Sequence, residues 1–201
     1  MVYDFSKICK TYEAKTYTRS DFAATRCPKC PAVGRFNLHG SYWRHVLYFT
    51  KRELKHEYIE IKRIMCISCE TTHAVMPGDI VPYKLLSLIV ILLILNLIYA
   101  GKEPVLKIAA AWRFSFQFIY FILAVFLKHK SGIYNFLREA SHGVILSELD
   151  SAGIVALVRR PYTQFQSDYI KLNKRPCFMC KFFNNANAPP VGLITPNMAA
   201  T

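Results

Sequence analysis

The pattern of apolar and polar positions changes near residue 80. Before it, apolar residues alternate over short stretches: Phe36 and Leu38 precede Gly40, and Ile59 and Ile61 alternate with charged residues. A period of two is typical of half-buried strands. Residues 26–80 are therefore expected to form a small β unit. The segment 76–83, MPGDIVPY, contains two prolines and a glycine and is expected to be a domain junction.

Long apolar runs after the junction predict helices. The runs 84–101 and 102–132 are both long enough, and each ends at a glycine near a lysine. Residues 1–25 have no clear periodicity and are interpreted as an N-terminal arm docked on the β unit. The predicted organisation is an arm (1–25), a β unit (26–80), a helical domain (81–145) and a basic, aromatic, partly flexible C-terminal extension (146–201).

Four of the seven cysteines form two C-x-x-C pairs, Cys27 with Cys30 and Cys66 with Cys69. Each such turn presents two sulfurs, and two turns complete a tetrahedral shell around zinc. Redox dithiols and ordinary buried cysteines are the alternatives, but two matched pairs around strand-like sequence favour zinc. We expect one structural Zn²⁺ in a zinc ribbon, where metal binding supplies folding free energy that a small core lacks.

Other candidate ligands lie near and beyond these pairs. His39, His45 and His73 are expected to be structural or surface residues, because four thiolates already complete the shell. Cys177 and Cys180 form a third C-x-x-C with no fourth pair to match it. We interpret them as ordinary thiols beside a basic, aromatic strip. The alternatives are a half-site completed by a second subunit or partner, and a site that includes His129 or His142.

The charge balance favours an anionic partner. Lys and Arg total 26 against 13 Asp and Glu, a formal net charge of +13, so the surface should attract a polyanion such as nucleic acid. Basic residues of the β unit are either a solvated face or phosphate contacts, and the sequence leaves both open. They are Arg44, Lys51, Arg52, Lys55, Lys62 and Arg63.

Residues 105–126 fit a helix-turn-helix, with the turn at Trp112 to Phe114 and Ser115 as the N-cap of the second helix. Ile119, Ile122 and Leu123 would face inward. Arg113 stands where glycine is usual, and a plain helical bundle is the alternative. The DNA contacts predicted from this motif are Arg113, Ser115, Phe116, Gln117 and Tyr120, with Gln117 as the best reader of adenine.

A membrane hairpin is the competing interpretation of these apolar runs. Residues 85–101 and 114–127 are runs of 17 and 14 residues without a charge, both shorter than the ~20 that a spanning helix needs. Each run also contains polar residues, so the membrane interpretation is disfavoured. The first residues lack the apolar stretch of a secretory signal, which predicts a cytoplasmic protein with reduced thiols.

The stretches CPKC, GSYWRHV and IEIKRIMCISCETTHAVMPGDIVPYKLLS resemble a bacterial zinc-ribbon family of largely unknown function that is associated with insertion elements and transposons. The resemblance covers about residues 25–125. It implies a zinc ribbon followed by a helix-turn-helix, a DNA-related role, and Cys27, Cys30, Cys66 and Cys69 as ligands.

These observations predict a fold class of α+β, with a small β zinc ribbon followed by an all-α helix-turn-helix bundle. The predicted function is DNA binding, as a transposition accessory factor or a transcriptional regulator. The alternative is a zinc-dependent module that docks on a recombinase or a membrane through its apolar helices. No carboxylate set on an α/β core and no nucleophile motif is present, so an enzyme is not expected. The expected partners are double-stranded DNA and a transposase or recombinase; a homodimer is left open.

Overall fold

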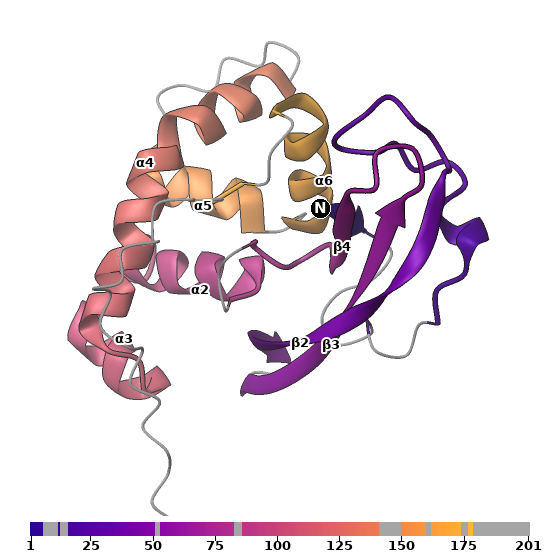
Figure 1. Ribbon diagram of the computed structural model, residues 1–201. Helices are drawn as coiled ribbons and strands as arrows, with labels where there is room; N and C mark the ends of the chain where they lie inside the picture. Colours follow the sequence, from indigo (N-terminus) through magenta and orange to yellow (C-terminus); the bar gives the residue numbers. More distant parts are fainter. Residues whose placement is uncertain are drawn as a thin grey trace, which may run out of the picture. The chain divides into compact units, whose positions relative to one another are not determined.

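The computed structural model describes residues 1–5, 12, 16–50, 53–82, 86–140, 150–159, 162–173 and 177–178. The chain divides into two compact units (Figure 1). The first comprises residues 1–90 and 161–176, and the second comprises residues 91–160 and 177–201.

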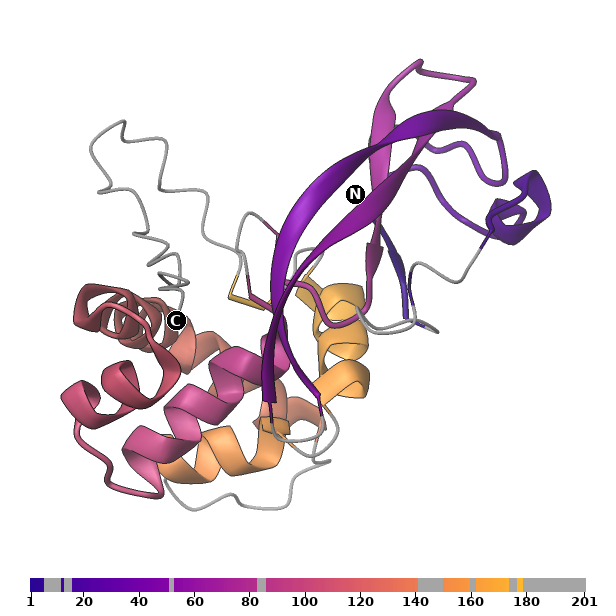
Figure 2. The same ribbon diagram turned by 90° about the horizontal axis from the view of Figure 1, so that it is seen from below.

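A four-stranded mixed sheet forms the first unit. Its strands are β1 (Val2–Asp4), β2 (Phe36–Thr50), β3 (Glu53–Cys66) and β4 (Thr72–Pro77), in the order β1-β4-β3-β2. β1 pairs parallel with β4, and the other neighbours are antiparallel. β2 and β3 form a long twisted hairpin (Figure 2). Its register runs from Phe36↔Cys66 to Thr50↔Glu53, with a bulge between Leu38 and Ser41.

The core of this unit contains side chains from the sheet and from the segment between β1 and β2. Val46, Ile59 and Ile61 are buried on one face of the hairpin, and the alternation in the sequence predicts this for Ile59 and Ile61. Of the other alternating pair, Phe36 is buried but Leu38 is exposed. Tyr12, Tyr17 and Phe22 are buried against them, and Phe22 ends the short 3-10 helix η1 (Arg19–Phe22). The Asp21 carboxylate accepts a hydrogen bond from the Thr18 backbone N–H at 2.7 Å, which fixes the start of η1.

Tyr12 links two strands through its hydroxyl, which donates to the Val75 carbonyl at 2.6 Å and accepts from the Lys62 N–H at 3.1 Å. Tyr12→Phe should therefore cost about 1–3 kcal/mol in the free energy of unfolding, measured by urea denaturation. Burial raises the pKa of Tyr12 to about 12. Because the folded pKa lies above the unfolded value, this stabilisation is complete below about pH 10 and is lost as the pH rises through 12.

Tyr58→Phe is the control, because the Tyr58 ring is 64% exposed and should change stability by less than about 0.5 kcal/mol. Equal stability of Tyr12→Phe and wild-type protein at neutral pH would contradict the bridging role.

A helix from late in the chain also belongs to the first unit. α6 (Tyr162–Asn173) buries Phe165, Gln166 and Tyr169. The Gln166 side-chain amide donates to the Ile80 carbonyl at 3.1 Å, across 86 positions of sequence. This bond satisfies a carbonyl in the predicted junction after β4, where the chain leaves the sheet.

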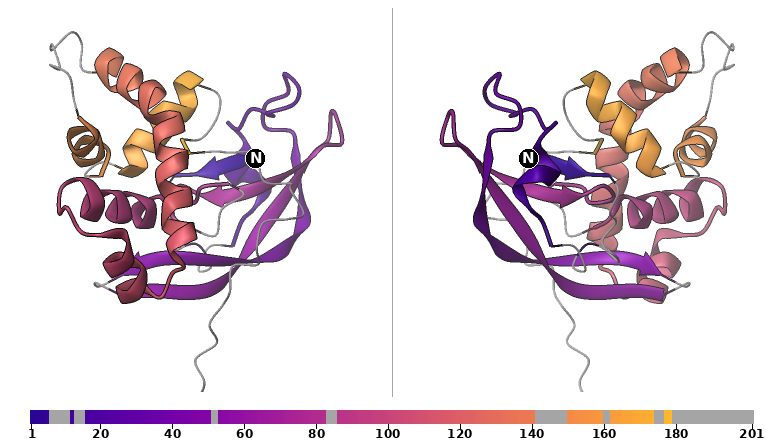
Figure 3. Two further views of the ribbon diagram at one scale, coloured as in Figure 1. Left: turned by 90° about the vertical axis from the view of Figure 1, so that its left-hand side faces the viewer. Right: turned by 90° about the vertical axis from the view of Figure 1, so that its right-hand side faces the viewer.

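The second unit is helical (Figure 3). It contains most of α2 (Leu88–Tyr99), then α3 (Val105–Trp112), α4 (Phe116–Ala140) and α5 (Ser151–Arg159). Ser115 caps α4, because its Oγ accepts a hydrogen bond from the Phe118 N–H at 3.2 Å. The second run was expected to end at Gly132, but α4 continues to Ala140 because Ile133 and Phe136 extend its buried face.

The class α+β fits the structure, but the predicted arrangement of a zinc ribbon followed by a helix-turn-helix bundle is wrong. A ribbon would have two short hairpins with one cysteine pair each. Here the strands belong to one mixed sheet, because β-favouring aromatic and aliphatic residues continue from Tyr42 to Phe49 and β2 pairs with β3 far beyond the cysteines. Local signals placed the turn before α4 correctly, but they do not determine how helices of 8 and 25 residues are arranged with the rest of the chain.

Within the described residues, no single helix is long and apolar enough to cross a membrane. α3 and α4 pass a test of length and composition only as a pair, and they are bent by 118° at their junction.

Candidate metal centre

The first cysteine pair lies in the loop between η1 and β2. The Cys27 N–H donates to the Ala32 carbonyl at 2.9 Å, which closes a tight turn around Cys30. Gly34 follows with φ +68°, and a Cβ at this position would lie 2.4 Å from the Ala23 carbonyl oxygen. Glycine is therefore required here by both conformation and space.

The second pair lies in the turn from β3 to β4. Cys66 ends β3, and its N–H donates to the Thr71 carbonyl at 3.0 Å. Glu70 donates its N–H to the Cys66 carbonyl at 2.8 Å and adopts a left-handed conformation with φ 53°. The Ile67 N–H donates to the Arg35 carbonyl at 2.9 Å, which ties this turn to the loop of the first pair.

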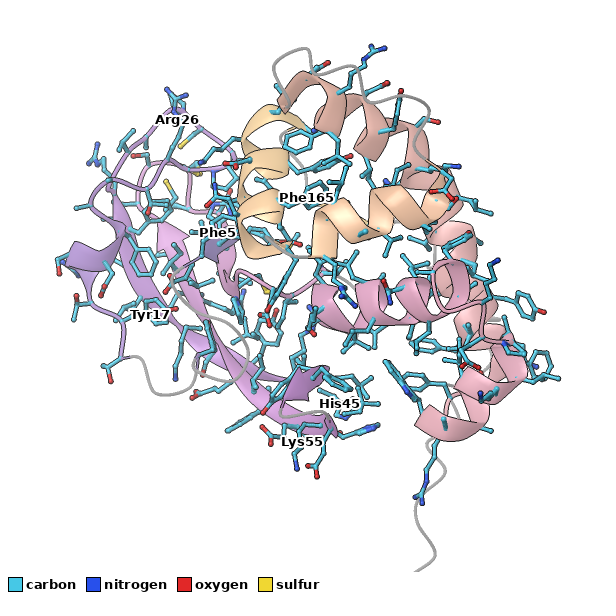
Figure 4. All side chains as sticks on the ribbon, turned by 180° about the vertical axis from the view of Figure 1, so that it is seen from behind. Phe5, Tyr17, Arg26, His45, Lys55 and Phe165 are labelled. Carbon is cyan, nitrogen blue, oxygen red and sulfur yellow. The ribbon has the colours of Figure 1, made fainter. Side chains whose placement is uncertain are left out.

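These two segments bring the four predicted thiols together. The sulfurs of Cys27, Cys30, Cys66 and Cys69 all lie within 4.8 Å of one another, and sulfur atoms are visible near Arg26 in Figure 4. The Sγ atoms of Cys27 and Cys69 are 3.7 Å apart, as are those of Cys30 and Cys66. All four cysteines are free.

The distances fit metal ligands and exclude disulfides. A disulfide requires about 2.05 Å between sulfurs. Four sulfurs placed tetrahedrally at about 2.3 Å from a central ion lie about 3.8 Å from one another. The two 3.7 Å separations match this edge length, so the cluster can hold a metal ion. Cys27 and Cys66 are buried, whereas Cys30 and Cys69 are half-buried.

Protonation differs between the two half-buried thiols. Hydrogen bonds from the Thr71 side chain and backbone lower the pKa of Cys69 to about 6. At Cys30 a hydrogen bond from the Ala32 backbone favours the thiolate, but burial and the neighbouring thiols outweigh it and raise the pKa to about 12. Four thiolates repel one another, so binding of a cation to the full set must displace protons.

His73 lies directly beside the cluster. Its Nε2 is 3.3 Å from the Cys27 Sγ, and its ring is buried against the Phe36 ring, with 6.2 Å between ring centroids. An imidazole N–H that donates to a ligand sulfur fixes that ligand's orientation, as partners of metal ligands commonly do. This histidine was expected to be structural or surface, and it is buried. Its contact with Cys27 was not predicted, because His73 is seven positions from Cys66 and 46 from Cys27.

The basic residues predicted as phosphate contacts are spread along β2 and β3. Arg44 donates from Nη2 to the Val81 carbonyl at 3.5 Å. Lys62 forms an ion pair with Glu60. Arg63 lies opposite Ala74 in the β3–β4 pairing and is half-buried. Lys55 forms an ion pair with Glu53, and Lys51 and Arg52 lie outside the described residues.

The DNA contacts predicted from the helix-turn-helix lie in the second unit. Arg113, in a left-handed conformation with φ 55°, directly follows α3 and caps its C-terminus. Ser115, Phe116, Gln117 and Tyr120 follow at the start of α4, and all five residues are exposed. Ile119 and Ile122 are buried, as predicted for the inner face. The assignment as base readers rested on the helix-turn-helix arrangement, and it stays a prediction.

The third C-x-x-C is described only in part. Cys177 is fully buried, and the neighbouring Phe178 ring lies 6.4 Å from Phe126 and 6.2 Å from His129, measured between ring centroids. Burial raises the pKa of the Cys177 thiol. Cys180 and His142 lie outside the described residues.

Comparison with known proteins identifies a matching domain family. The family described as "Domain of unknown function (DUF6431)" matches residues 27–106. The match begins at Cys27, contains both cysteine pairs and ends just inside α3. No curated protein and no solved structure matches.

Proposed function

We propose that the protein is a zinc-stabilised DNA-binding protein that acts as an accessory factor in transposition or as a transcriptional regulator. The observation that carries the proposal is the position of the four thiols, which lie where the long β2–β3 hairpin begins and ends. A metal ion held there would tie the loop before β2 to the end of β3. The hairpin would then project from a fixed base.

Zinc is the metal that best suits this ligand set. Four thiolates in a tetrahedral arrangement select zinc or iron–sulfur chemistry, whereas magnesium and calcium prefer oxygen ligands. The two C-x-x-C turns, separated by strand sequence, have the usual spacing of structural zinc sites. Four protein ligands leave no open position on the ion, which supports a structural role.

Charge supports a nucleic-acid partner. The chain has a formal net charge of +13, and residues 36–66 of the hairpin contain six Lys or Arg and three Glu. Contacts between such side chains and phosphates supply most of the affinity for DNA irrespective of sequence. Double-stranded DNA is the proposed partner, with a transposase or recombinase bound alongside.

The test is the salt dependence of duplex binding by the full-length, zinc-loaded protein. Affinity should fall by about 10³-fold between about 50 and 200 mM salt if about six phosphates are contacted. Arg44→Gln should weaken binding to all sequences and reduce the logarithmic salt slope by about 1. Fluorescence anisotropy measures both quantities.

Lys171→Gln on α6 is the matched control, because Lys171 is paired with Asp168 outside the hairpin. It should leave the slope unchanged.

The alternative function, docking on a protein or membrane through apolar helices, predicts weak and salt-insensitive retention of DNA. Leu106, Tyr120 and Leu127 on α3 and α4 are exposed and favour this second candidate. Absence of duplex binding even at about 50 mM salt would contradict the proposed function.

A further inference from the structure

One face of the β2–β3 hairpin carries four rings, of which those of Trp43, His56 and Tyr58 are exposed and that of His45 is half-buried. Trp43 is 65% exposed and Tyr58 is 64% exposed. His45 lies opposite Tyr58 in the register, and their ring centroids are 5.1 Å apart. The ring of His56 follows at 5.8 Å from His45. We call Trp43, His45, His56 and Tyr58 the ring face; Figure 4 labels His45 near the far end of the hairpin.

The register places these rings on the same side. Residues directly opposite each other in an antiparallel pair share a face, and side chains alternate along each strand. Trp43 and His45 are two positions apart on β2, and His56 and Tyr58 are two apart on β3. Arg44 and Val46 point to the other face, together with Ile59 and Ile61.

Leu47 lies opposite His56 on the ring side and is buried, but folding of the hairpin does not account for the exposed rings of Trp43 and Tyr58. The buried residues Val46, Ile59 and Ile61 lie on the opposite side and belong to the core of the first unit. Trp43 and Tyr58 gain little from folding, because most of each side chain stays in contact with water. Grouped exposed aromatic residues are a common mark of a binding surface.

We propose that the ring face binds a single-stranded segment of DNA by stacking its bases on Trp43 and Tyr58. This rests on the proposed function, and it specifies the form of DNA that the hairpin prefers. Every base has a flat π face, so aromatic rings beside basic residues bind single strands with little sequence preference. The net charge of +13 supplies the long-range attraction for the phosphates, while on the ring face itself Lys62 is paired with Glu60.

Three features favour a single strand over other partners. In a duplex the base faces stack on one another and are not available to the rings. Trp43 and Tyr58 are diagonal neighbours across the strand pair, about 7–8 Å apart, so each can engage a different base. Ser41, Glu60 and Lys62 share this face with the rings. The Glu60 carboxylate accepts hydrogen bonds from the Ser41 hydroxyl and from the Lys62 ammonium group. Such polar residues suit a wet nucleic-acid surface better than the apolar centre of a protein interface.

The experiment compares Trp43→Ala and Tyr58→Ala with wild-type full-length, zinc-loaded protein. The probes are a labelled oligothymidylate of about 20 nucleotides, longer than the ~4–16 that such a surface covers, and a duplex of similar length. Each substitution should weaken oligothymidylate binding by about 5- to 150-fold, which corresponds to one stacked base. Duplex affinity should change by less than about 3-fold, because phosphate contacts are intact.

Two controls separate stacking from a general loss of structure. Trp43→Phe keeps an aromatic ring and should retain oligothymidylate binding within about 5-fold of wild type. Leu172→Ala removes a 56% exposed apolar side chain from α6, outside the hairpin and the predicted DNA contacts, and should change neither affinity. Thermal unfolding of all variants should match wild type, since the altered residues are exposed.

The outcomes distinguish this inference from the function on which it rests. Wild-type oligothymidylate affinity in both alanine variants, with salt-dependent duplex binding intact, would overturn the ring face alone and leave it as a surface for a protein partner. Failure of wild-type protein to bind either probe would overturn both proposals. An equal loss in Trp43→Phe and Trp43→Ala would also contradict stacking.

Discussion

Cys66→Ser is expected to release the metal and unfold the first unit. Cys66 is fully buried, ends β3 and lies opposite Phe36 in the register of the hairpin. Serine has a poor ligand oxygen for this thiolate set, and the three remaining thiols would have to complete the shell with water. Structural zinc supplies about 10–16 kcal/mol of apparent free energy in small zinc domains, which equals or exceeds the ~5–15 kcal/mol stability of a typical domain.

The measurement combines metal analysis with circular dichroism. Wild-type protein should contain one metal ion per chain, and a chelator should produce the same loss of strand signal as Cys66→Ser. Acid should do so as well, because protons compete with the metal for thiolates. Cys177→Ala is the matched control, since it removes a buried thiol outside the cluster and should retain the metal. A Cys66→Ser variant that keeps wild-type stability would contradict the structural role.

Phe36→Ala should destabilise the first unit by about 3–5 kcal/mol. The Phe36 ring is buried at the start of β2, where it packs edge-on against Phe22 and His73 at centroid distances of 6.3 and 6.2 Å. The Phe36 ring therefore connects η1, the sheet and His73, whose imidazole contacts the Cys27 sulfur. Alanine would leave a cavity among these groups, and His73 would lose the ring that holds its imidazole in place.

Urea unfolding of the metal-loaded protein measures this cost. Phe36→Leu should cost less than the alanine variant, because it fills part of the space. Phe116→Ala should cost under about 0.5 kcal/mol, since that ring is half exposed on α4. A Phe36→Ala variant within about 1 kcal/mol of wild type would show that Phe36 does not join these elements.

The metal cluster could be predicted because its signal is local in sequence. Each C-x-x-C turn sets its own two thiols side by side, and only one long-range step was needed to bring the pairs together. The strand positions around Phe36 and Ile59 were likewise readable from alternation. The resemblance to a zinc-ribbon family carried the same ligand set but implied an arrangement of strands that the structure does not have.

The wrong part of the fold depended on pairing between distant segments. β1 has three residues, and nothing in Val2–Asp4 indicates that it pairs parallel with β4 across more than 70 positions. The packing of α6 in the first unit involves a hydrogen bond from Gln166 to Ile80, a contact that no local sequence pattern predicts. Ser115 and Ile119 were correctly placed as cap and buried face, yet these local features are equally compatible with many helical arrangements.

Part of the ring face could have been predicted from the sequence. Side chains alternate along any strand, so a strand through residues 42–46 places Trp43 and His45 on the same side. The partner rings on β3 could be identified only once the register was known. The bulge between Leu38 and Ser41 shifts that register, so counting from the cysteines alone would misplace the pairs.

X-ray absorption at the zinc edge of the purified protein tests the metal assignment most directly. The account predicts one zinc per chain, surrounded by four sulfur atoms at about 2.3 Å. Nitrogen or oxygen atoms in that shell, or a folded protein without stoichiometric metal, would contradict it.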